Sequence, residues 1–539
     1  MLNFALRVKL YLINKIFNGI NLIIEKMKKL CYVMALVGML ILCNEANAQT
    51  KWHWEKGTIV VDAPARPAGQ QHALGLSTAP LPVVRVAFVG LGMRGPGAVE
   101  RWTHINGVRI VALCDYERER AERCNGYLKK ANMPEAEVYF GDYGYEVLCQ
   151  RKDIDLVYIA TDWVHHVPVA KCALENGKHV AIEVPSAMDL KDCWELIDLS
   201  EQKRLHCMLL ENCCYDDFEL NSLNMAQQGV FGDVLRVQGA YIHNLSDFWG
   251  SYWKNWRLEY NRTHRGDVYA THGLGPVAQV LDIHRGDRMK TLVAMDTKAA
   301  TGPELVKQLT GKDCTEEEFR NGDHTTTLIR TEKGKVIEIQ HDVMNPQPYN
   351  RLYQLTGTKG FANKYPIQGY ALDAGQMKSS GVAPQVDNLS SHSFMKKADM
   401  DALVEKYQSP ILKKYGAEAK VVGGHGGMDF VMDARLVYCL QNGLPLDIDV
   451  YDLAEWCCLA ELGALSMDNN CAPVAVPDFT RGHAYDQKGY RHAYASEEQE
   501  AETAAIAKAY TMTLKTKGVK AAEAELQKQL KLQAKKHKK

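Results

Sequence analysis

The chain has 539 residues, of which 46% are hydrophobic, and a formal net charge of −1. This length predicts two or three domains with a large core. The near-zero charge excludes a general attraction for nucleic acid or for acidic membranes, so we expect no nucleic-acid partner. The 15 cysteines are scattered without a CxxC pair or zinc-finger spacing, which predicts buried free thiols and no metal site.

The first 48 residues are typical of a targeting segment. Met27-Lys28-Lys29 is a short basic start, residues 30–42 are apolar, and Ala46-Asn47-Ala48 is a small-x-small cleavage signal. Residues 1–26 are then an upstream extension. The apolar run is shorter than a bilayer span. We therefore expect a periplasmic or secreted protein that is cleaved after Ala48 and keeps no membrane span.

The rest of the chain predicts an α/β protein. Residues 49–82 lack periodicity and predict an N-terminal arm. Over 83–211, strands alternate with amphipathic helices, which predicts a Rossmann domain with a doubly wound parallel sheet. Over 212–480, the pattern predicts an α+β domain with a largely antiparallel open sheet. The expected strands are 84–89, 108–113, 138–139, 156–160, 180–183 and 206–211, followed by 234–243, 291–297, 325–331, 336–343 and 352–356.

The C-terminal part of the chain predicts helices. The expected helices of the second domain include 428–441 and 451–465. The extension over 481–539 is rich in Ala, Glu, Lys and Gln from Ser496 onward, and it ends in a basic run. This composition predicts a solvated helix with a frayed basic end. A surface-binding tail is the alternative.

A glycine-rich turn, Gly90-Leu91-Gly92-Met93-Arg94-Gly95, follows the first Rossmann strand. Gly90 permits the tight turn, Gly92 lets the backbone approach a pyrophosphate, and Gly95 lets the next helix pack closely. The second strand ends at Asp115, whose carboxylate is expected to accept the adenosine ribose hydroxyls. Because this carboxylate repels a 2′-phosphate, the motif predicts NAD rather than NADP. Met93 and Arg94 are placed at the cofactor with the glycines.

Polar residues also follow the later parallel strands. Thr161, Trp163 and His166 come after one strand and Glu183 after the next. The carboxyl ends of such strands face the ligand crevice. We expect Thr161, Trp163 and His166 to contact the cofactor. We expect Glu183 to orient ribose or substrate hydroxyls, as a cofactor-binding and catalytic residue.

Around residues 177–185 the chain resembles the Gfo/Idh/MocA oxidoreductases, which carry a catalytic lysine in a Glu-Lys-Pro motif. Here Val184 stands in the place of that lysine. Val184 and several other motifs of the chain resemble glycoside hydrolase family 109, a family of NAD-dependent α-N-acetylgalactosaminidases. The resemblance covers most of residues 83–480, and its motifs lie at 183–185, 211–215, 265–276, 348–351, 424–430 and 443–447.

The resemblance implies a glycosidase acting on terminal N-acetylgalactosaminides or related glycosides. Oxidation of the C3 hydroxyl acidifies the C2 proton, and its removal expels the aglycone. Water then adds at C1 and C3 is reduced again, so that no net redox occurs. The substrate is a small glycoside or a glycan.

The resemblance also implies roles for individual residues. His272 is expected to be the base at the C3 hydroxyl, because an imidazole exchanges protons near neutral pH. Tyr215 is expected to handle the C2 proton, and Tyr269 to share the catalytic site three residues before His272. Tyr349 is expected to line the sugar pocket, and His425 to approach the same cleft.

Several alternatives stay open. A net sugar oxidoreductase and a non-catalytic NAD-containing sugar-binding protein both fit the Rossmann motif. A direct glycosidase using Glu183 and Glu211 would need a defined carboxyl separation and no dinucleotide. Trp253, Trp256 and Arg257 belong to a Trp-rich insertion that either stacks on sugar rings or packs in the protein. The C2 substituent, the anomer, the aglycone and the oligomeric state are left open, and a homo-oligomer is compatible with the sequence.

Overall fold

The computed structural model describes residues 50–381 and 392–536. The predicted upstream extension and signal peptide, with the cleavage after Ala48, lie outside the described residues. Within the described ranges, no helix is long and apolar enough to cross a membrane. The chain from Trp52 onward forms one unit that contains two sheets.

The first sheet is the predicted parallel one. Its strand order is β5-β4-β3-β6-β7-β8, and every neighbouring pair is parallel. Runs such as Val108-Arg109-Ile110-Val111-Ala112-Leu113 form central strands because helices cover both faces of a doubly wound sheet. The six expected strands are confirmed to within two residues. The strands are β3 (Val84–Val89), β4 (Val108–Asp115), β5 (Glu137–Phe140), β6 (Leu156–Ile159), β7 (His179–Ile182) and β8 (Cys207–Leu209).

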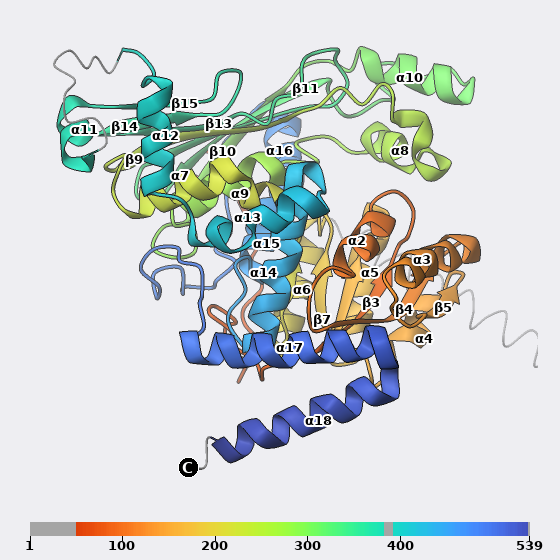
Figure 1. Ribbon diagram of the computed structural model, residues 1–539. Helices are drawn as coiled ribbons and strands as arrows, with labels where there is room; N and C mark the ends of the chain where they lie inside the picture. Colours follow the sequence, from red (N-terminus) through yellow and green to blue (C-terminus); the bar gives the residue numbers. More distant parts are fainter. Residues whose placement is uncertain (1–49, 382–391, 537–539) are drawn as a thin grey trace, which may run out of the picture. The chain divides into compact units, whose positions relative to one another are not determined.

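Helices connect these strands in the alternation that the sequence predicts (Figure 1). Asp162 caps the helix after β6 by accepting a hydrogen bond from the His165 amide, and Asp189 caps the helix after β7 in the same way. The helices are α2 (Gly95–Trp102), α3 (Arg118–Lys130), α4 (Gly144–Cys149), α5 (Trp163–Glu175) and α6 (Leu190–Lys203).

The second sheet has ten strands in the order β1-β2-β16-β10-β11-β12-β9-β13-β14-β15. It is antiparallel except at the pairs β12–β9 and β16–β2, so the predicted largely antiparallel sheet is confirmed. The predicted N-terminal arm contributes the hairpin β1–β2, which the sequence did not indicate. The strands are β1 (Trp52–Glu55), β2 (Thr58–Val61), β9 (Val234–Ile242), β10 (Met289–Asp296), β11 (His324–Thr331), β12 (Val336–Asp342), β13 (Tyr353–Gly357), β14 (Gly360–Asn363), β15 (Gly369–Leu372) and β16 (Val474–Ala475).

The helices of this region include the predicted one at residue 428, whereas the single helix expected over 451–465 is two helices that meet at Cys458. The backbone at Cys458 stays in the helical region (φ −64°, ψ −19°), so the interruption is local. The α-helices are α7 (Asp217–Gln227), α8 (Trp256–Thr263), α9 (Thr271–Val280), α10 (Thr301–Thr310), α11 (Ala374–Ser380), α12 (Lys397–Lys406), α13 (Pro410–Val422), α14 (Met428–Asn442), α15 (Val450–Cys457) and α16 (Leu459–Asp468). The 3₁₀ turns are η1 (Asn212–Tyr215), η2 (Trp249–Ser251), η3 (Trp253–Asn255) and η4 (His425–Gly427).

Two glycines let α9 lie directly against β9. A Cβ at Gly239 would come within 2.1 Å of the Gly273 carbonyl oxygen, and one at Gly273 within 2.5 Å of the Ala240 nitrogen. A larger residue at either position would push the helix away from the strand. This close approach brings the first turn of α9, which carries His272, next to Tyr241 on β9, with ring centroids 5.1 Å apart.

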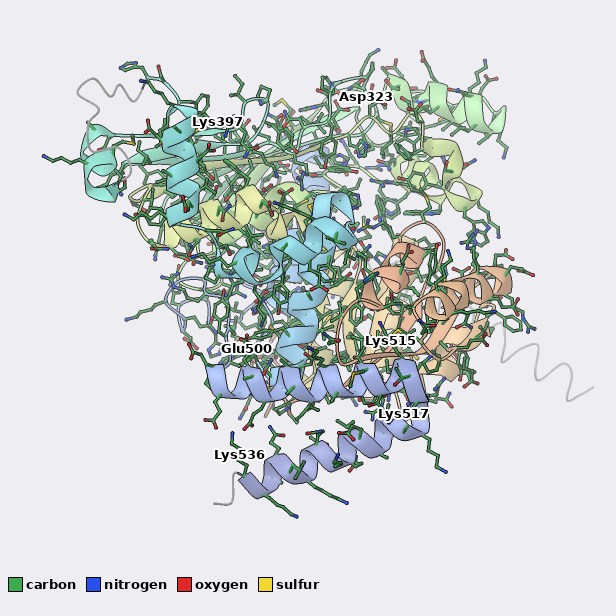
Figure 2. All side chains as sticks on the ribbon, viewed as in Figure 1. Asp323, Lys397, Glu500, Lys515, Lys517 and Lys536 are labelled. Carbon is green, nitrogen blue, oxygen red and sulfur yellow. The ribbon has the colours of Figure 1, made fainter. Side chains whose placement is uncertain are left out.

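The C-terminal extension forms a helical pair, α17 (Glu497–Lys517) and α18 (Val519–Lys536). The prediction of a solvated helix is wrong for α17, because Ile506, Tyr510 and Leu514 at i, i+4 and i+8 form a buried apolar stripe. Figure 2 shows Lys517 at the end of α17, where the chain turns into α18, and Lys536 at the far end of α18. Lys536 pairs with acidic residues of α17, so the basic charge is partly neutralised.

The cysteines that the structure describes are free thiols, as the sequence predicts. Ten of these 13 are buried, so their thiols pack as small apolar groups. Burial raises the pKa of Cys114 to about 12, which keeps this thiol protonated near the cofactor turn. A disulfide framework therefore contributes nothing to the described fold.

Candidate functional site

The glycine turn after β3 fits a dinucleotide. Gly90 has φ +91°, and a Cβ there would lie 2.4 Å from the Ala160 carbonyl carbon. A Cβ at Gly95 would lie 2.0 Å from the Gly90 oxygen, so these two glycines are required by the packing of the turn itself. A Cβ at Gly92, in contrast, meets nothing nearer than Arg120 Nη1 at 3.7 Å. The side of the turn at Gly92 is therefore open for the approach of a ligand, and Met93 beside it is exposed.

Asp115, at the end of β4, fixes the turn from the neighbouring strand. Its carboxylate accepts hydrogen bonds from the Leu91 amide (2.6 Å) and the Glu117 amide (2.9 Å), with Arg120 Nη1 at 3.5 Å. A carboxylate has about four acceptor positions, so these bonds leave capacity for ribose hydroxyls. The ribose contact stays a prediction.

The residues after β6 have mainly protein partners. The His166 ring nitrogens face the carbonyl oxygens of Pro185 (2.8 Å) and Thr161 (3.1 Å), and the ring is buried. His166 thus joins α5 to the loop after β7. The Thr161 hydroxyl donates to the Asp162 carbonyl, and Trp163 is covered by aromatic rings. The predicted cofactor contacts of Thr161, Trp163 and His166 stay predictions.

Gly92 offers a test of cofactor binding that spares the fold. We expect Gly92→Leu to lower the NAD content of the purified protein at least about tenfold, because the side chain would fill the space that a pyrophosphate needs. The Tm of protein freed of NAD should change little, since a Cβ at Gly92 meets no protein atom closer than 3.7 Å. NAD content is measured by chromatography after denaturation. Gly126→Leu is the matched control on α3, where a Cβ has no neighbour within 4 Å, and a Gly92→Leu protein with full NAD content would contradict the assignment.

A charged cluster links the glycine turn to Glu183, directly after β7. Arg94 Nη2 lies 3.3 Å from Glu183 Oε1, and Arg94 Nη1 lies 3.4 Å from Asp429 Oδ2 and 3.1 Å from His425 Nδ1. The Tyr158 hydroxyl donates to the same oxygen of Glu183 at 3.2 Å. The structure thus brings together the predicted residues Arg94, Glu183 and His425.

Asp429, at the start of α14, organises this cluster. Burial opposes its ionisation, but the hydrogen bond with His425 and the charges of Arg94 and Arg101 outweigh burial and lower the pKa of Asp429. Its other oxygen accepts from Asn212 Nδ2 at 2.6 Å. The ionised Asp429 therefore anchors four side chains, those of Arg94, Arg101, Asn212 and His425.

The predicted base His272 lies against Glu211, which follows β8. His272 Nδ1 is 2.6 Å from Glu211 Oε1, and the carboxylate is fully buried. Burial opposes ionisation of Glu211, but the facing imidazole and its hydrogen bond lower the pKa of this carboxyl. Since an ionised carboxylate only accepts hydrogen bonds, Nδ1 carries the proton and donates it. The Nε2 atom of His272 is then free to act as a base.

The glycines of the motif Thr271-His272-Gly273-Leu274-Gly275-Pro276 make room for this pair. A Cβ at Gly275 would come within 2.9 Å of Glu211 Cγ and of the Trp456 ring. Gly275 therefore lets Glu211 reach His272, while Gly273 lets α9 approach β9. The motif combines a base with the backbone space that its partner needs.

Aromatic rings surround the other side of His272. The Tyr269 and Tyr241 ring centroids lie 5.0 Å and 5.1 Å from that of His272, and Tyr269 stacks on Trp163 of α5 at 5.6 Å. Burial and, after it, the neighbouring Tyr241 raise the pKa of Tyr269, whose hydroxyl therefore stays protonated. The charges of Glu183 and Arg94 also act on this hydroxyl. Tyr269 is thus in ring contact with His272 and within electrostatic range of the cluster at the glycine turn.

Arg257, on α8, is a charged group of this region that has unused donors. Its guanidinium lies 4.6 Å from the Tyr269 ring centroid and 5.0 Å from that of Trp163. Nη1 donates to the Tyr252 hydroxyl at 2.8 Å, but the buried Nε and Nη2 atoms have no hydrogen-bond partner in the described structure. An unpaired buried guanidinium is costly, so these donors suit the oxygens of a ligand.

Two predicted residues make no hydrogen bond or ring contact with His272 in the described structure. The Tyr215 hydroxyl donates to Asp447 Oδ2 at 3.2 Å in a buried cluster with Arg435, and its polar and ring contacts do not include His272. Its part in C2 proton transfer stays a prediction. Tyr349 is 43% exposed, and its ring contacts His243 at 5.0 Å, so it lies where solvent or a substrate reaches the second sheet.

Glu211, His272 and Cys213 also place three possible metal-ligand atoms within 4.8 Å of one another. The residues do not fit a metal, because Arg351 Nη1 lies 2.9 Å from Cys213 Sγ and supplies a positive charge there. Burial also raises the pKa of the Cys213 thiol, which disfavours a thiolate ligand. The group therefore acts as a carboxylate–imidazole pair.

Sequence reasoning missed three residues of this site. Glu211 entered only as one carboxylate of a direct glycosidase, and Arg257 only within the Trp-rich insertion. Tyr241 sits on a strand whose alternating pattern says which face it occupies but not which helix covers it. The signal that was available for Glu211 is its place two residues after a parallel strand, close to the place that singled out Glu183.

Comparisons with known proteins agree with this geometry. The model of the oxidoreductase family with an NAD-binding Rossmann fold (Gfo/Idh/MocA) matches residues 84–210, and that of the glycosyl hydrolase 109 C-terminal domain matches residues 215–486. Glycosyl hydrolase family 109 protein 5 of Phocaeicola vulgatus is 68% identical over 507 residues, 92% of this chain and 97% of the relative. Glycosyl hydrolase family 109 protein 1 of Bacteroides thetaiotaomicron is 59% identical over 470 residues, 87% of this chain and 100% of the relative.

Among solved structures, levoglucosan dehydrogenase in complex with NADH matches 73% of this chain and 99% of its own, with 17% identity and a TM-score of 0.54, which shows a shared fold. Fold and site thus define an NAD-binding protein with the architecture of the Gfo/Idh/MocA oxidoreductases. The chain belongs to glycosyl hydrolase family 109. It is therefore a glycosidase whose cofactor is NAD.

Proposed function

We propose that this glycosidase releases terminal N-acetylgalactosamine, in the α configuration, by an oxidation–elimination–hydration–reduction cycle without net redox. The observation that carries the proposal is the hydrogen bond between the buried Glu211 and His272, beside Tyr269, in a chain that also has the open glycine turn. Bound NAD would supply the reversible oxidation of the sugar at C3, held by the turn at Gly92 and by Asp115. Proton transfer at C3 and the binding of the sugar belong to the side chains.

His272 is the base of the proposed cycle. Its Nε2 takes the proton from the C3 hydroxyl, and Glu211 stabilises the imidazolium that forms, because the carboxylate is ionised and lies 2.6 Å from Nδ1. The same Nε2 returns the proton when C3 is reduced. Tyr269 stays protonated and donates a hydrogen bond to a sugar oxygen.

The substrate is recognised by the unused hydrogen-bond donors of Arg257 and by the exposed ring of Tyr349. The Nε and Nη2 atoms of Arg257 would bind sugar oxygens beside Tyr269, since they have no protein partner among the described residues. Tyr349 would cover the sugar from the exposed side. Glu183 would hold hydroxyl groups while Arg94 keeps its carboxylate in place.

A direct hydrolysis by Glu183 and Glu211 is disfavoured by the state of Glu211. A general acid in a glycosidase needs a raised pKa, whereas the pKa of Glu211 is lowered. As a nucleophile, Glu211 would have to leave His272, its buried partner. The pair geometry supports proton transfer by the imidazole instead.

Hydrolysis in deuterated water tests the proposed cycle. We expect deuterium at C2 of the released sugar, because the C2 proton is removed and replaced in each turnover. A C3-deoxy substrate should be inert, since it offers no hydroxyl to oxidise. The test uses nitrophenyl N-acetylgalactosaminides of both anomers, with NMR or mass spectrometry of the product.

The outcomes separate the alternatives. Sugar released at full rate without exchange at C2 would falsify the elimination route and favour direct displacement. Stoichiometric accumulation of NADH and a keto-sugar would instead indicate a net oxidoreductase. Absence of turnover on nitrophenyl glycosides with different C2 substituents, with NAD retained, would indicate a sugar-binding protein.

A further inference from the structure

Two histidines and an aspartate meet at the junction between the predicted N-terminal arm and the segment after β16. The ligand atoms of His72, His483 and Asp486 lie within 4.8 Å of one another. Asp486 Oδ2 is 2.7 Å from His483 Nδ1 and 3.9 Å from His72 Nε2. Both imidazoles therefore converge on one carboxylate oxygen, far in sequence from the catalytic residues.

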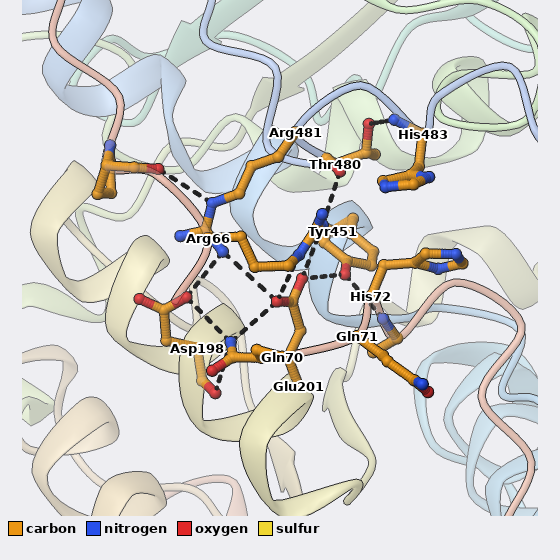
Figure 3. A network of polar contacts seen from close by, with 12 residues as sticks. Arg66, Gln70, Gln71, His72, Asp198, Glu201, Tyr451, Thr480, Arg481 and His483 are labelled. Atoms are coloured by element: carbon orange, nitrogen blue, oxygen red, sulfur yellow. Dashed lines mark hydrogen bonds and ion pairs between the residues drawn. The ribbon is translucent and has the colours of Figure 1, made fainter. Parts of the chain in front are cut away.

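The imidazoles pack against each other without a hydrogen bond between them. Their ring centroids are 4.4 Å apart, and Figure 3 shows the His72 and His483 side chains side by side. The Nδ1 atom of His72 is buried and has no hydrogen-bond partner within the described structure. His72 thus has one unused nitrogen, Nδ1, while its Nε2 faces the Asp486 carboxylate.

The backbone on both sides of this cluster is held in place. The His72 carbonyl accepts a hydrogen bond from Arg204 Nη1 (2.7 Å), and the His483 amide donates to the Thr480 hydroxyl (3.1 Å). Arg66 Nη2 donates to the Thr480 carbonyl (2.9 Å) and pairs with Glu201, as Figure 3 shows. The histidines are therefore preorganised by a polar network that does not depend on their own side chains.

The side chains themselves keep access to solvent. Those of His72, His483 and Asp486 are 33%, 34% and 51% exposed. An ion can enter from outside, and small rotations would bring the three ligand atoms to the 2.0–2.2 Å at which zinc is bound. Water would complete the tetrahedron, because three protein ligands leave one position open.

We propose that His72, His483 and Asp486 bind a divalent ion of the zinc type, which fastens the arm to the segment after β16. Two imidazoles and one carboxylate suit zinc and its transition-metal neighbours, whereas calcium and magnesium prefer sites made of oxygen ligands. The ion joins residues more than 400 positions apart, so it constrains the chain ends of the fold. Its role is structural, and it does not depend on the proposed function.

Zinc titration of the full chain, made without a polyhistidine tag and stripped with EDTA, tests the site. We expect about one Zn²⁺ per chain by metal analysis, and a rise in Tm of about 1–5 °C at a hundredfold excess of Zn²⁺ over its Kd. His72→Ala and His483→Gln should each abolish most of the binding and of the Tm rise. Because both side chains are partly exposed, these variants should fold, which their Tm in EDTA verifies.

His53→Ala is the matched control. His53 lies on β1, and its Nδ1 is 3.3 Å from Asp62, so it forms an exposed histidine–carboxylate pair without a second imidazole. This variant should bind Zn²⁺ and respond in Tm like the wild type. Zinc binding that survives both His72→Ala and His483→Gln, or that is lost only in His272→Ala, would overturn the proposal. A wild-type chain that binds no Zn²⁺ would overturn it as well.

Discussion

Replacing His272 by alanine should lower kcat by about 10²- to 10⁴-fold, the contribution of a positioned general base. The neutral Nε2 that takes the substrate proton is lost, whereas the glycine turn that holds NAD is untouched. NAD content should therefore stay close to that of the wild type, whereas the Tm should fall, because the buried Glu211 loses its partner. The measurement is steady-state release of nitrophenol from a nitrophenyl N-acetylgalactosaminide, with NAD assayed in the same preparation.

Chemical rescue makes this test specific for proton transfer. Added imidazole should restore part of the turnover of His272→Ala, because a free base can enter the space that the ring vacates. His324→Ala is the matched control, since His324 also faces a carboxylate, that of Asp342 at 3.3 Å, but lies on β11. A His272→Ala enzyme with kcat within about threefold of the wild type would show that another residue is the base.

The two sheets could be predicted from the sequence because short-range patterns determine them. Buried parallel strands are nearly continuous apolar runs, and the antiparallel strands alternate, so both types stand out over six to nine residues. The glycine turn could also be predicted from the sequence, since the spacing of Gly90, Gly92 and Gly95 follows from local geometry. Placing Glu183 at the end of β7 required only the strand order of a Rossmann sheet.

The partners of the site residues could not be predicted in the same way. Glu211 and His272 are 61 residues apart, and their contact depends on Gly275, whose missing Cβ leaves room for the carboxylate. Arg257, on α8, lies 4.6 Å from the ring centroid of Tyr269, which precedes α9. These contacts arise from tertiary packing, which no local pattern in one sequence records.

Tyr215 shows why a motif does not give the direction of its side chains. It stands close to Glu211 in the sequence, yet η1 turns the chain between them. The Glu211 carboxylate faces His272, whereas the Tyr215 hydroxyl faces Asp447. The prediction of a solvated C-terminal helix was wrong for a related reason. Charged residues dominate the composition of α17, whereas its narrow apolar stripe around Tyr510 is buried.

Replacing Glu211 by glutamine should lower kcat by about 10²- to 10⁴-fold, although the side chain keeps its size. The carboxylate only accepts hydrogen bonds, so it holds the His272 proton on Nδ1. The amide of glutamine can donate to Nδ1 instead, which places the proton on Nε2 and removes the base. Glu211 is thus a positioning residue that acts through His272.

The pH dependence distinguishes this role from a merely structural one. In the wild type, the ionised Glu211 stabilises the imidazolium of His272. Without that charge, the acid limb of the kcat–pH profile should move to lower pH in Glu211→Gln. NAD content should stay unchanged. A variant that only destabilises the fold would lower the Tm but leave the shape of the profile intact.

Glu455 provides the matched control for Glu211. It forms a second buried pair with a histidine, His284, at 3.1 Å. Burial raises the pKa of Glu455, so this carboxyl is protonated and glutamine resembles it in charge and shape. Glu455→Gln should therefore keep the kcat and the pH profile of the wild type. If both variants lose activity in parallel with their Tm, the Glu211–His272 pair only contributes to packing, and the positioning role is wrong. If only Glu211→Gln loses activity, and the acid limb of its kcat–pH profile moves, the buried carboxylate sets the tautomer of the catalytic imidazole.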